Sequence, residues 1–230
     1  MNREDFTEAI KARHSVRKYT DKPIPADIVA ALQAEIAKCN DEGRLNIQLV
    51  LNEPKAFTGI MSYGKFSGVN NYLVMVGKKA NDLDERIGYY GEQLVLLAQH
   101  LGLNTCWVGL TYRKVNEAFC VGDGEKLTCV IALGYGVDSG VKHKIKSVEQ
   151  VSNAGDSTPA WFVEGVKAAL LAPTAVNQQR FSFQYIGVEN GRHKVKADKG
   201  FSLMGYTKMD LGIAKRHFEI GAGRENFDWC

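Results

Sequence analysis

Apolar residues near the start of the chain recur at the spacing of an α-helix. Phe6, Ala9 and Ile10 lie at i, i+3 and i+4, which predicts an amphipathic helix over residues 2–12. Helical periodicity predicts further helices over 27–38, 84–102, 113–119 and 159–170. The helix over 84–102 is apolar nearly all round, which is typical of a helix in the centre of a domain, and Gly102 is a suitable C-terminal stop.

Alternating or continuous apolar runs between these helices predict strands. They cover 45–52, 104–109 and 127–133, with one more inside 70–79. Helices and strands that follow one another in this way predict an α/β or α+β domain with a covered sheet.

Two pairs of segments indicate that the chain repeats itself. The segments 25–36 and 159–170 share a Pro-Ala start and a similar apolar pattern, and 98–107 resembles 214–223 in rhythm. We interpret these likenesses as a degraded internal duplication, with two related halves packed about a pseudo-two-fold axis. A chance likeness between amphipathic helices is the alternative.

The boundary between the halves follows from composition. Residues 152–158, SNAGDST, have the composition of a linker. We therefore expect a first half over 1–151 and a second half over 159–230, which is too short to be a complete copy.

Composition excludes several classes of protein. The 230 residues carry a formal charge of only +3, which does not favour nucleic acid as the main partner. No run of about 18 apolar residues predicts a membrane span, and the first residues have no apolar region typical of a signal peptide. Five cysteines without a C-x-x-C pair predict neither a disulfide framework nor a zinc site, and we expect a cytoplasmic protein.

The stretch RHSVRKY, residues 13–19, concentrates cations just after the first helix. Arg13 falls at i+7 on the apolar face of that helix, so we expect it to point inward. If the chain is extended afterwards, Ser15 and Arg17 share one side and Val16 takes the other. Guanidinium groups and a hydroxyl would then converge on one spot and suit phosphate oxygens. A solvated basic turn is the alternative.

Other motifs do not support a catalytic or metal site. GIMSYGKF, residues 59–66, nearly matches a phosphate-binding loop, but Phe66 replaces the hydroxyl that holds magnesium. No G-x-G-x-x-G follows a strand, and the five histidines lack metal-ligand spacing. His14 and Ser15 have no evident acidic partner, so a serine hydrolase is unsupported. We therefore name no metal.

RHSVRKY, followed by a proline and an amphipathic helix, resembles the opening of the FMN-dependent nitroreductase family. Three more stretches resemble family segments: APTAVNQQRF at 172–181, GLNTCWVG at 102–109 and KHKIKSVEQV at 142–151. The resemblance implies an α+β fold with a central, mostly antiparallel sheet flanked by helices. It also implies FMN as the cofactor.

The resemblance implies roles for individual residues. At the phosphate end it implies contacts from Arg13, His14, Ser15, Arg17, Lys144 and Lys146, with the choice among these last two lysines and Lys142 left open. It places Lys65 at the ribityl chain or the pyrimidine edge. At the ring end it implies main-chain contacts from Val108 and Gly109, and side-chain contacts from Pro173, Thr174, Ala175 and Asn177. A solvated loop lysine is the alternative for Lys65. Arg180 and Phe181 stand where the family has Pro-Trp.

One departure from the family pattern concerns the order of segments. In the family, the proline–asparagine segment follows the helix after the basic stretch, whereas here it appears only after the second copy of that helix. Family members are usually dimers that share their flavins. This order resembles a fused, single-chain subgroup, so we expect a monomer that acts as a pseudo-dimer with one FMN per chain.

The resemblance implies an oxidoreductase with a ping-pong mechanism. NAD(P)H would deliver a hydride to FMN, and a nitroaromatic, a quinone or a similar flat acceptor would then be reduced. The cofactor would carry this reaction, so we name no catalytic residue. The choice of NADH or NADPH and the physiological acceptor stay open. The alternatives are a reductive dehalogenase or enoyl-type reductase on the same scaffold, a flavin-binding or carrier protein without turnover, and a module that captures another phosphate.

Overall fold

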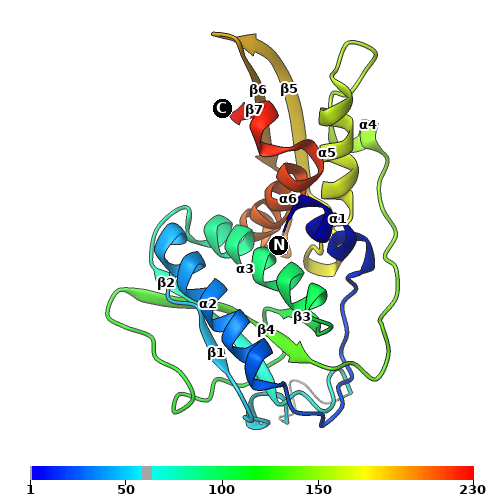
Figure 1. Cartoon of the computed structure of the whole chain (residues 1–230). Coiled ribbons are helices and arrows are strands. Elements are labelled where there is room, and N and C mark those ends of the chain that lie inside the picture. Colours follow the sequence, from blue (N-terminus) through cyan, green and yellow to red (C-terminus); the bar gives the residue numbers. More distant parts are fainter. Residues whose placement is uncertain (1, 59–63) are drawn as a thin grey trace. The chain divides into compact units, whose positions relative to one another are not determined.

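The computed structural model describes residues 2–58 and 64–230, and its contacts divide the chain into two compact units. We call residues 12–83 and 93–142 the four-stranded unit, and residues 2–11, 84–92 and 143–230 the three-stranded unit. Figure 1 shows the elements of both.

The four-stranded unit contains α2 (Ala26–Gly43), β1 (Gln48–Val50), the short 3-10 helix η1 (Lys55–Phe57), β2 (Asn71–Lys78), β3 (Asn104–Val108) and β4 (Glu125–Gly134). The three-stranded unit contains α1 (Arg3–Ala12, whose last residue falls in the other unit), α4 (Val148–Val151), α5 (Ala160–Leu170), η2 (Ala175–Asn177), β5 (Phe181–Glu189), β6 (Arg192–Lys199), α6 (Thr207–Ala222), η3 (Arg224–Asn226) and β7 (Phe227–Trp229). The helix α3 (Leu83–His100) contributes residues to each unit.

The four-stranded sheet has the order β1-β2-β4-β3 and is antiparallel throughout. Seven consecutive residues of β2, from Asn71 to Gly77, are buried, because layers cover both faces of the sheet. On one face, Leu32 of α2 and Ala98 of α3 pack with Leu133 of β4. On the other face, loops and the basic stretch supply the covering side chains, including Phe57 and Val16.

The three-stranded sheet pairs β5 and β6 as a hairpin, with β7 parallel to β6. Asn190 and Gly191, both at positive φ, form the turn, as the Asn-Gly pair favours. Aromatic side chains fill the core beside this sheet, where Phe183 stacks on Phe218 of α6 and Trp161 of α5 stacks on Phe227. The unit is therefore built around aromatic contacts.

Two glycines bring α3 and α6 into close contact within the three-stranded unit. A Cβ on Gly88 would lie 2.0 Å from the carbonyl oxygen of Met209, and a Cβ on Gly212 would lie 2.0 Å from that of Glu85. The glycine of each helix thus contacts the residue that lies three positions before the glycine of the other helix. This reciprocal contact requires glycine at both positions.

The structure confirms the α+β class and the mostly antiparallel sheet. The predicted helices over 2–12, 84–102 and 159–170 are present, and Gly102 ends α3 at a φ of 81°. The helix predicted over 113–119 is wrong, because this segment forms only turns, one of which is closed by the N–H of Ala118 on the carbonyl oxygen of Val115. The strand expected over 45–52 shortens to β1.

The predicted halves, 1–151 and 159–230, refer to a duplication in the origin of the chain. The compact units are defined by contacts and contain other ranges of residues. The expected linker, residues 152–158, contains no helix, and its first residue forms an isolated bridge with Phe183.

Candidate functional site

The basic stretch runs extended beside β3 in the four-stranded unit. Ser15 forms a parallel bridge with Thr105, and the N–H of Val16 donates to the Thr105 carbonyl oxygen at 3.0 Å. Val16 is buried and Arg17 is exposed, as the alternation of an extended segment predicts. Arg13 is only 3% exposed, so its side chain points inward as expected.

Side chains of this stretch converge on the thiol of Cys106 in β3. Burial raises the pKa of that thiol, while the positive charge of Arg17, a hydrogen bond from the Ser15 hydroxyl and the charge of Arg13 oppose the increase. Tyr19, which is buried beside them, has a raised pKa because of burial and the nearby Cys106. Two guanidinium groups and a hydroxyl therefore lie within electrostatic reach of the same thiol, and such donors suit a phosphate group.

Lys65 lies just before a segment that is hydrogen-bonded to the basic stretch. The N–H of Ser67 donates to the Arg17 carbonyl oxygen at 3.0 Å, and Tyr19 N–H donates to the Ser67 carbonyl oxygen at 2.9 Å. Gly68 makes this approach possible, since a Cβ there would lie 2.1 Å from the Tyr19 carbonyl oxygen. Lys65 itself is exposed, two residues before this ladder, and the remainder of the near-match to a phosphate-binding loop, 59–63, lies outside the described residues.

His14, Val108 and Gly109 complete the group predicted in this unit. His14 is partly buried, and a Cβ on Gly140 would lie 2.8 Å from its Cβ. Val108 is the last residue of β3 and is buried, and Gly109 follows it. Beyond Ser15, however, Tyr19 forms a bridge with Gly136, two residues past the Gly134 that pairs with Asn104, so the segment leads to the start of β3 and not to Val108.

The remaining predicted residues form one hydrogen-bonded network in the three-stranded unit. Its centre is Gln179, whose side-chain oxygen accepts from the Lys146 N–H at 3.0 Å and whose Nε2 donates to the Lys144 carbonyl oxygen at 2.8 Å. Asn177 Nδ2 donates to the same carbonyl oxygen at 2.8 Å, and Thr174 Oγ1 accepts from the Gln179 N–H at 3.1 Å. The two segments that the sequence singled out, 142–151 and 172–181, are therefore joined.

This loop holds an unusual backbone conformation. Val176, Asn177 and Gln179 have φ angles of 47°, 56° and 46°, in the left-handed region that is costly for a β-branched residue such as Val176. Pro173 and Ala175 lie on either side of Thr174, which precedes the 3-10 turn η2. Such strain persists only when surrounding contacts fix it, and it is often found at binding sites.

A buried carboxylate fixes the loop from α6. Asp210, 2% exposed, accepts from the Ala175 N–H at 3.0 Å and from Gln178 Nε2 at 2.6 Å. Burial raises its pKa to about 6, although both hydrogen bonds favour the ionised form. The carboxylate thus holds the loop most firmly above that pH.

The network limits the number of hydrogen bonds that the Asn177 side chain can form with a ligand. Its amide group donates to Lys144 and its Oδ1 accepts from Gln179 Nε2 at 2.9 Å, so one N–H and one lone pair remain for a ligand. Sequence reasoning missed Gln178, Gln179 and Asp210. The signals present were the two glutamines inside the matched segment and a single acid in the apolar run MDLGIA.

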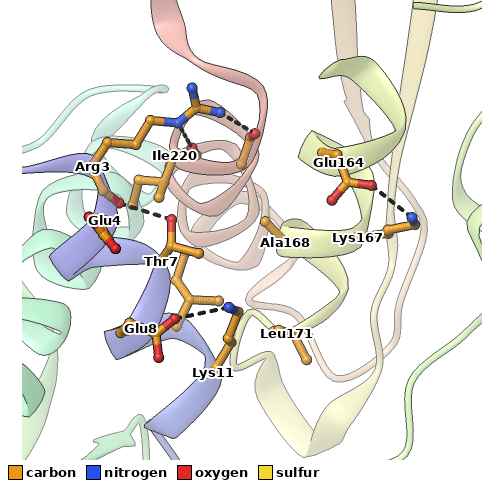
Figure 2. A pocket seen from close by; sticks show the side chains of 12 residues that line it. Arg3, Glu4, Thr7, Glu8, Lys11, Glu164, Lys167, Ala168, Leu171 and Ile220 are labelled. Carbon is orange, nitrogen blue, oxygen red and sulfur yellow. Dashed lines mark hydrogen bonds and ion pairs between the residues drawn. The ribbon is translucent and has the colours of Figure 1, made fainter. Parts of the chain in front are cut away.

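A pocket of about 670 Å³ lies elsewhere in the three-stranded unit, between α1, α5 and α6 (Figure 2). Four of its charged side chains form exposed ion pairs with one another: Glu8 pairs with Lys11 at 2.9 Å, and Glu164 pairs with Lys167 at 2.7 Å. None of the predicted site residues lines it.

The described residues show neither a cluster of metal ligands nor a helix that could span a membrane. Residues 2–58 and 64–230 contain no cluster of three or more His, Cys, Asp or Glu side chains placed to hold a metal ion. In the same residues, every helix is too short or too polar to cross a membrane.

The sequence matches a protein family described as "Putative TM nitroreductase" over residues 5–222. The chain belongs to this nitroreductase family. No curated protein matches the sequence significantly. The matched residues include both the basic stretch and the strained loop.

Solved structures show the same fold. A protein from Thermotoga maritima, described as a "putative nitroreductase", is 21% identical with a TM-score of 0.66, over 98% of this chain and 87% of that one. One from Desulfovibrio desulfuricans, in complex with FMN, is 15% identical with a TM-score of 0.52, over 67% of this chain and 98% of that one. Nitroreductase A from Vibrio parahaemolyticus is 18% identical with a TM-score of 0.51, over 69% and 79%.

Proposed function

We propose that this nitroreductase-family protein is an FMN-dependent oxidoreductase that uses NAD(P)H to reduce nitroaromatics, quinones or other flat acceptors. The observation that carries the proposal is the convergence of Arg13, Ser15 and Arg17 on Cys106 at the edge of a covered sheet. When bound, FMN supplies two-electron chemistry. The FMN complex of the Desulfovibrio relative supports this choice of cofactor.

The chain's own residues would bind and orient the cofactor. Arg13, Ser15 and Arg17 offer charge-assisted hydrogen bonds to a phosphate dianion, with His14 in the same stretch and Lys65 on a neighbouring segment. Val108 and Gly109 offer main-chain groups at the end of β3. Lys144, Lys146 and the loop of Pro173, Thr174, Ala175 and Asn177 are assigned to the cofactor by the resemblance alone.

The test compares FMN with riboflavin, which lacks the phosphate. Arg17→Gln is expected to weaken FMN binding about tenfold or more, because it removes a charge-assisted contact, and to leave riboflavin binding unchanged. Lys18→Gln is the matched control, since Lys18 is exposed but faces the other side of the extended segment. Flavin fluorescence quenching gives the two dissociation constants.

Four outcomes would contradict the proposal. Equal losses of affinity for FMN and riboflavin in Arg17→Gln would contradict the assignment of Arg17 to the phosphate. An equal loss of FMN affinity in the control Lys18→Gln would contradict it too. Failure of the wild-type protein to bind either flavin would contradict the assignment of FMN as the cofactor. FMN binding without acceptor-dependent NAD(P)H oxidation would favour a carrier protein.

We also propose that the chain arose by internal duplication. The order helix, strand, strand, helix, strand occurs in α2-β1-β2-α3-β3 and again in α5-β5-β6-α6-β7. Pro25 and Pro159 precede α2 and α5 with nearly the same φ and ψ, and Gly102 and Gly223 follow α3 and α6 at a φ of 81°. The reciprocal contact of Gly88 and Gly212 adds support.

A further inference from the structure

Most cations of the three-stranded unit face a carboxylate. The ion pairs are Arg3–Glu225, Lys11–Glu8, Lys167–Glu164, Arg192–Asp228, Lys194–Asp228, Lys196–Asp198, Lys215–Glu85, Arg216–Glu219 and Arg224–Glu219. Among the cations that the structure describes in this unit, Lys144, Lys146, Arg180 and Lys199 make no such pair.

Two of these cations, Lys146 and Arg180, lie close together at one end of the β5–β6 hairpin. Lys146 Nζ donates to the carbonyl oxygen of Gln179, and its pKa is lowered by burial and by the charge of Arg180. Lys199 pairs in register with Phe181, so its side chain lies on the face of the hairpin opposite to that of Arg180. Like charges that gather without a carboxylate indicate a place for an anion.

Exposed apolar side chains border the same spot. The N–H of Gly200 donates to the Arg180 carbonyl oxygen at 2.6 Å, which holds the start of the 200–205 loop beside Arg180. Phe201 is 81% exposed and Leu203 is 93% exposed. Gln178 Nε2 donates to the Gly205 carbonyl oxygen at 3.1 Å, which connects the end of this loop to the strained segment. Large apolar side chains grouped on a surface are typical of a binding site.

We propose that Arg180, with Lys146 beside it, binds the anionic group of a flat aromatic acceptor whose ring lies on Phe201 and Leu203. The proposal rests on the proposed function, and it names the acceptor class as aromatic compounds with a carboxylate or sulfonate. The planar guanidinium group suits such a two-oxygen anion. A second copy of the chain joined through this same surface would bring like charges together, which disfavours self-association there.

The first test uses ligands that no flavin can reduce. Isothermal titration measures the binding of naphthalene-2-sulfonate and of its neutral counterpart, naphthalene-2-sulfonamide. Arg180→Gln is expected to weaken sulfonate binding about tenfold and to leave sulfonamide binding unchanged, because only the charge-assisted contact is lost. Arg180→Lys restores part of the affinity. The matched control is Lys196→Gln, a cation of the same hairpin that is already paired with Asp198.

The apolar half of the site has its own variant and control. Phe201→Ala is expected to weaken both naphthalene ligands, because both place the same ring on it. Val188→Ala removes an exposed apolar side chain from the opposite end of the hairpin, roughly 20–25 Å away along β5, and should change neither.

The second test measures turnover with 1,4-naphthoquinone and its 2-sulfonate as acceptors. Arg180→Gln is expected to raise KM for the sulfonate alone, with kcat and FMN content unchanged. Loss of FMN, equal increases in both KM values, or equal weakening of both naphthalene ligands would overturn the proposal. The titration does not depend on flavin, so sulfonate selectivity that needs Arg180 would support this subsite even if the proposed reaction failed.

Discussion

The strands β2 and β6 hold the same place in their respective series of elements, yet they are buried to very different degrees. From Asn71 to Gly77 every residue of β2 is buried, whereas Val195 is the one buried residue of β6. β2 lies in a sheet covered on both faces, while β6 lies in a sheet whose helices and aromatic core occupy one face. The second sheet thus keeps a face open to solvent.

The two sheets also differ in one strand. In the first sheet β4 lies between β2 and β3, and it is antiparallel to both. In the second sheet β7 pairs directly with β6, in parallel. If the two series share an origin, the second has lost the counterpart of β4 and is stabilised instead by packing on α5 and α6. The stability of the second series should therefore depend most on contacts among its helices.

The largest expected effect concerns a buried pair between α3 and α6. His217 Nε2 lies 2.8 Å from Glu92 Oε1 and Nδ1 lies 3.1 Å from the Ala168 carbonyl oxygen, with both side chains fully buried. A carbonyl oxygen only accepts, so Nδ1 carries a proton and a second proton is shared with Glu92. His217→Leu is expected to lower the free energy of unfolding by about 3–5 kcal/mol, measured in urea, because the Glu92 carboxyl group stays in the interior.

A double variant tests whether this loss comes from the pair. Adding Glu92→Leu to His217→Leu should recover much of the lost stability, since an apolar replacement of both groups avoids the desolvation cost. His193→Leu, at a partly exposed histidine bonded to Tyr185, serves as the control and should cost about 1 kcal/mol. Losses that simply add in the double variant would contradict this account.

A smaller effect is expected where α3 and α6 touch. Gly88→Ala and Gly212→Ala should each lower the free energy of unfolding by about 3 kcal/mol, because each added Cβ meets a backbone carbonyl oxygen that cannot move independently. The reciprocal geometry predicts similar losses for both, measured by thermal and urea unfolding. Gly155→Ala is the control, since nothing lies within 4 Å of its added Cβ. A tolerated change at one glycine alone would remove the evidence for a symmetric crossing.

Sequence periodicity was sufficient for α2, α3 and α5 and for β2, whereas it gave no bounds for α6. In the run 94–98 every residue except the partly buried Leu97 is buried, as its apolar surface predicts. The segment 113–119 was misassigned because its short apolar spacing fits one turn, and Arg113 N–H bonds to the Ala56 carbonyl oxygen instead of continuing a helix. The strands β5 and β6 were not placed, although the Asn190-Gly191 pair was a hairpin signal.

The candidate site shows the same division between local and distant information. The extended path of Ser15 and Arg17 and the inward position of Arg13 followed from alternation and helical spacing. The central position of Gln179 and the bonds from Asp210 to the loop did not, because they join segments more than 30 residues apart. A single sequence does not reveal such tertiary pairings.

The smallest expected effect follows from the pKa of Asp210, about 6, against an ordinary value of 3.8. The raised pKa means that the protonated group stabilises the fold; this contribution is complete below about pH 3.8 and is lost as pH rises through about 6. The difference corresponds to at most about 3 kcal/mol. Asp210→Asn removes this titration, so the stability of the variant relative to the wild type should rise by up to this amount between pH 3.5 and pH 8, as measured by urea unfolding.

The same substitution separates stability from loop geometry. The asparagine Oδ1 can accept from Ala175 or Gln178, but its amide nitrogen cannot accept from the other, so one of the two bonds is lost at every pH. Amide hydrogen exchange at Ala175 should therefore be faster in the variant above pH 6, even where the variant is the more stable protein. Asp198→Asn, at an exposed ion pair with Lys196, should change neither property. Parallel pH profiles for Asp210→Asn and the wild type would show that the pKa of the Asp210 carboxyl group is close to its ordinary value, which would contradict this prediction.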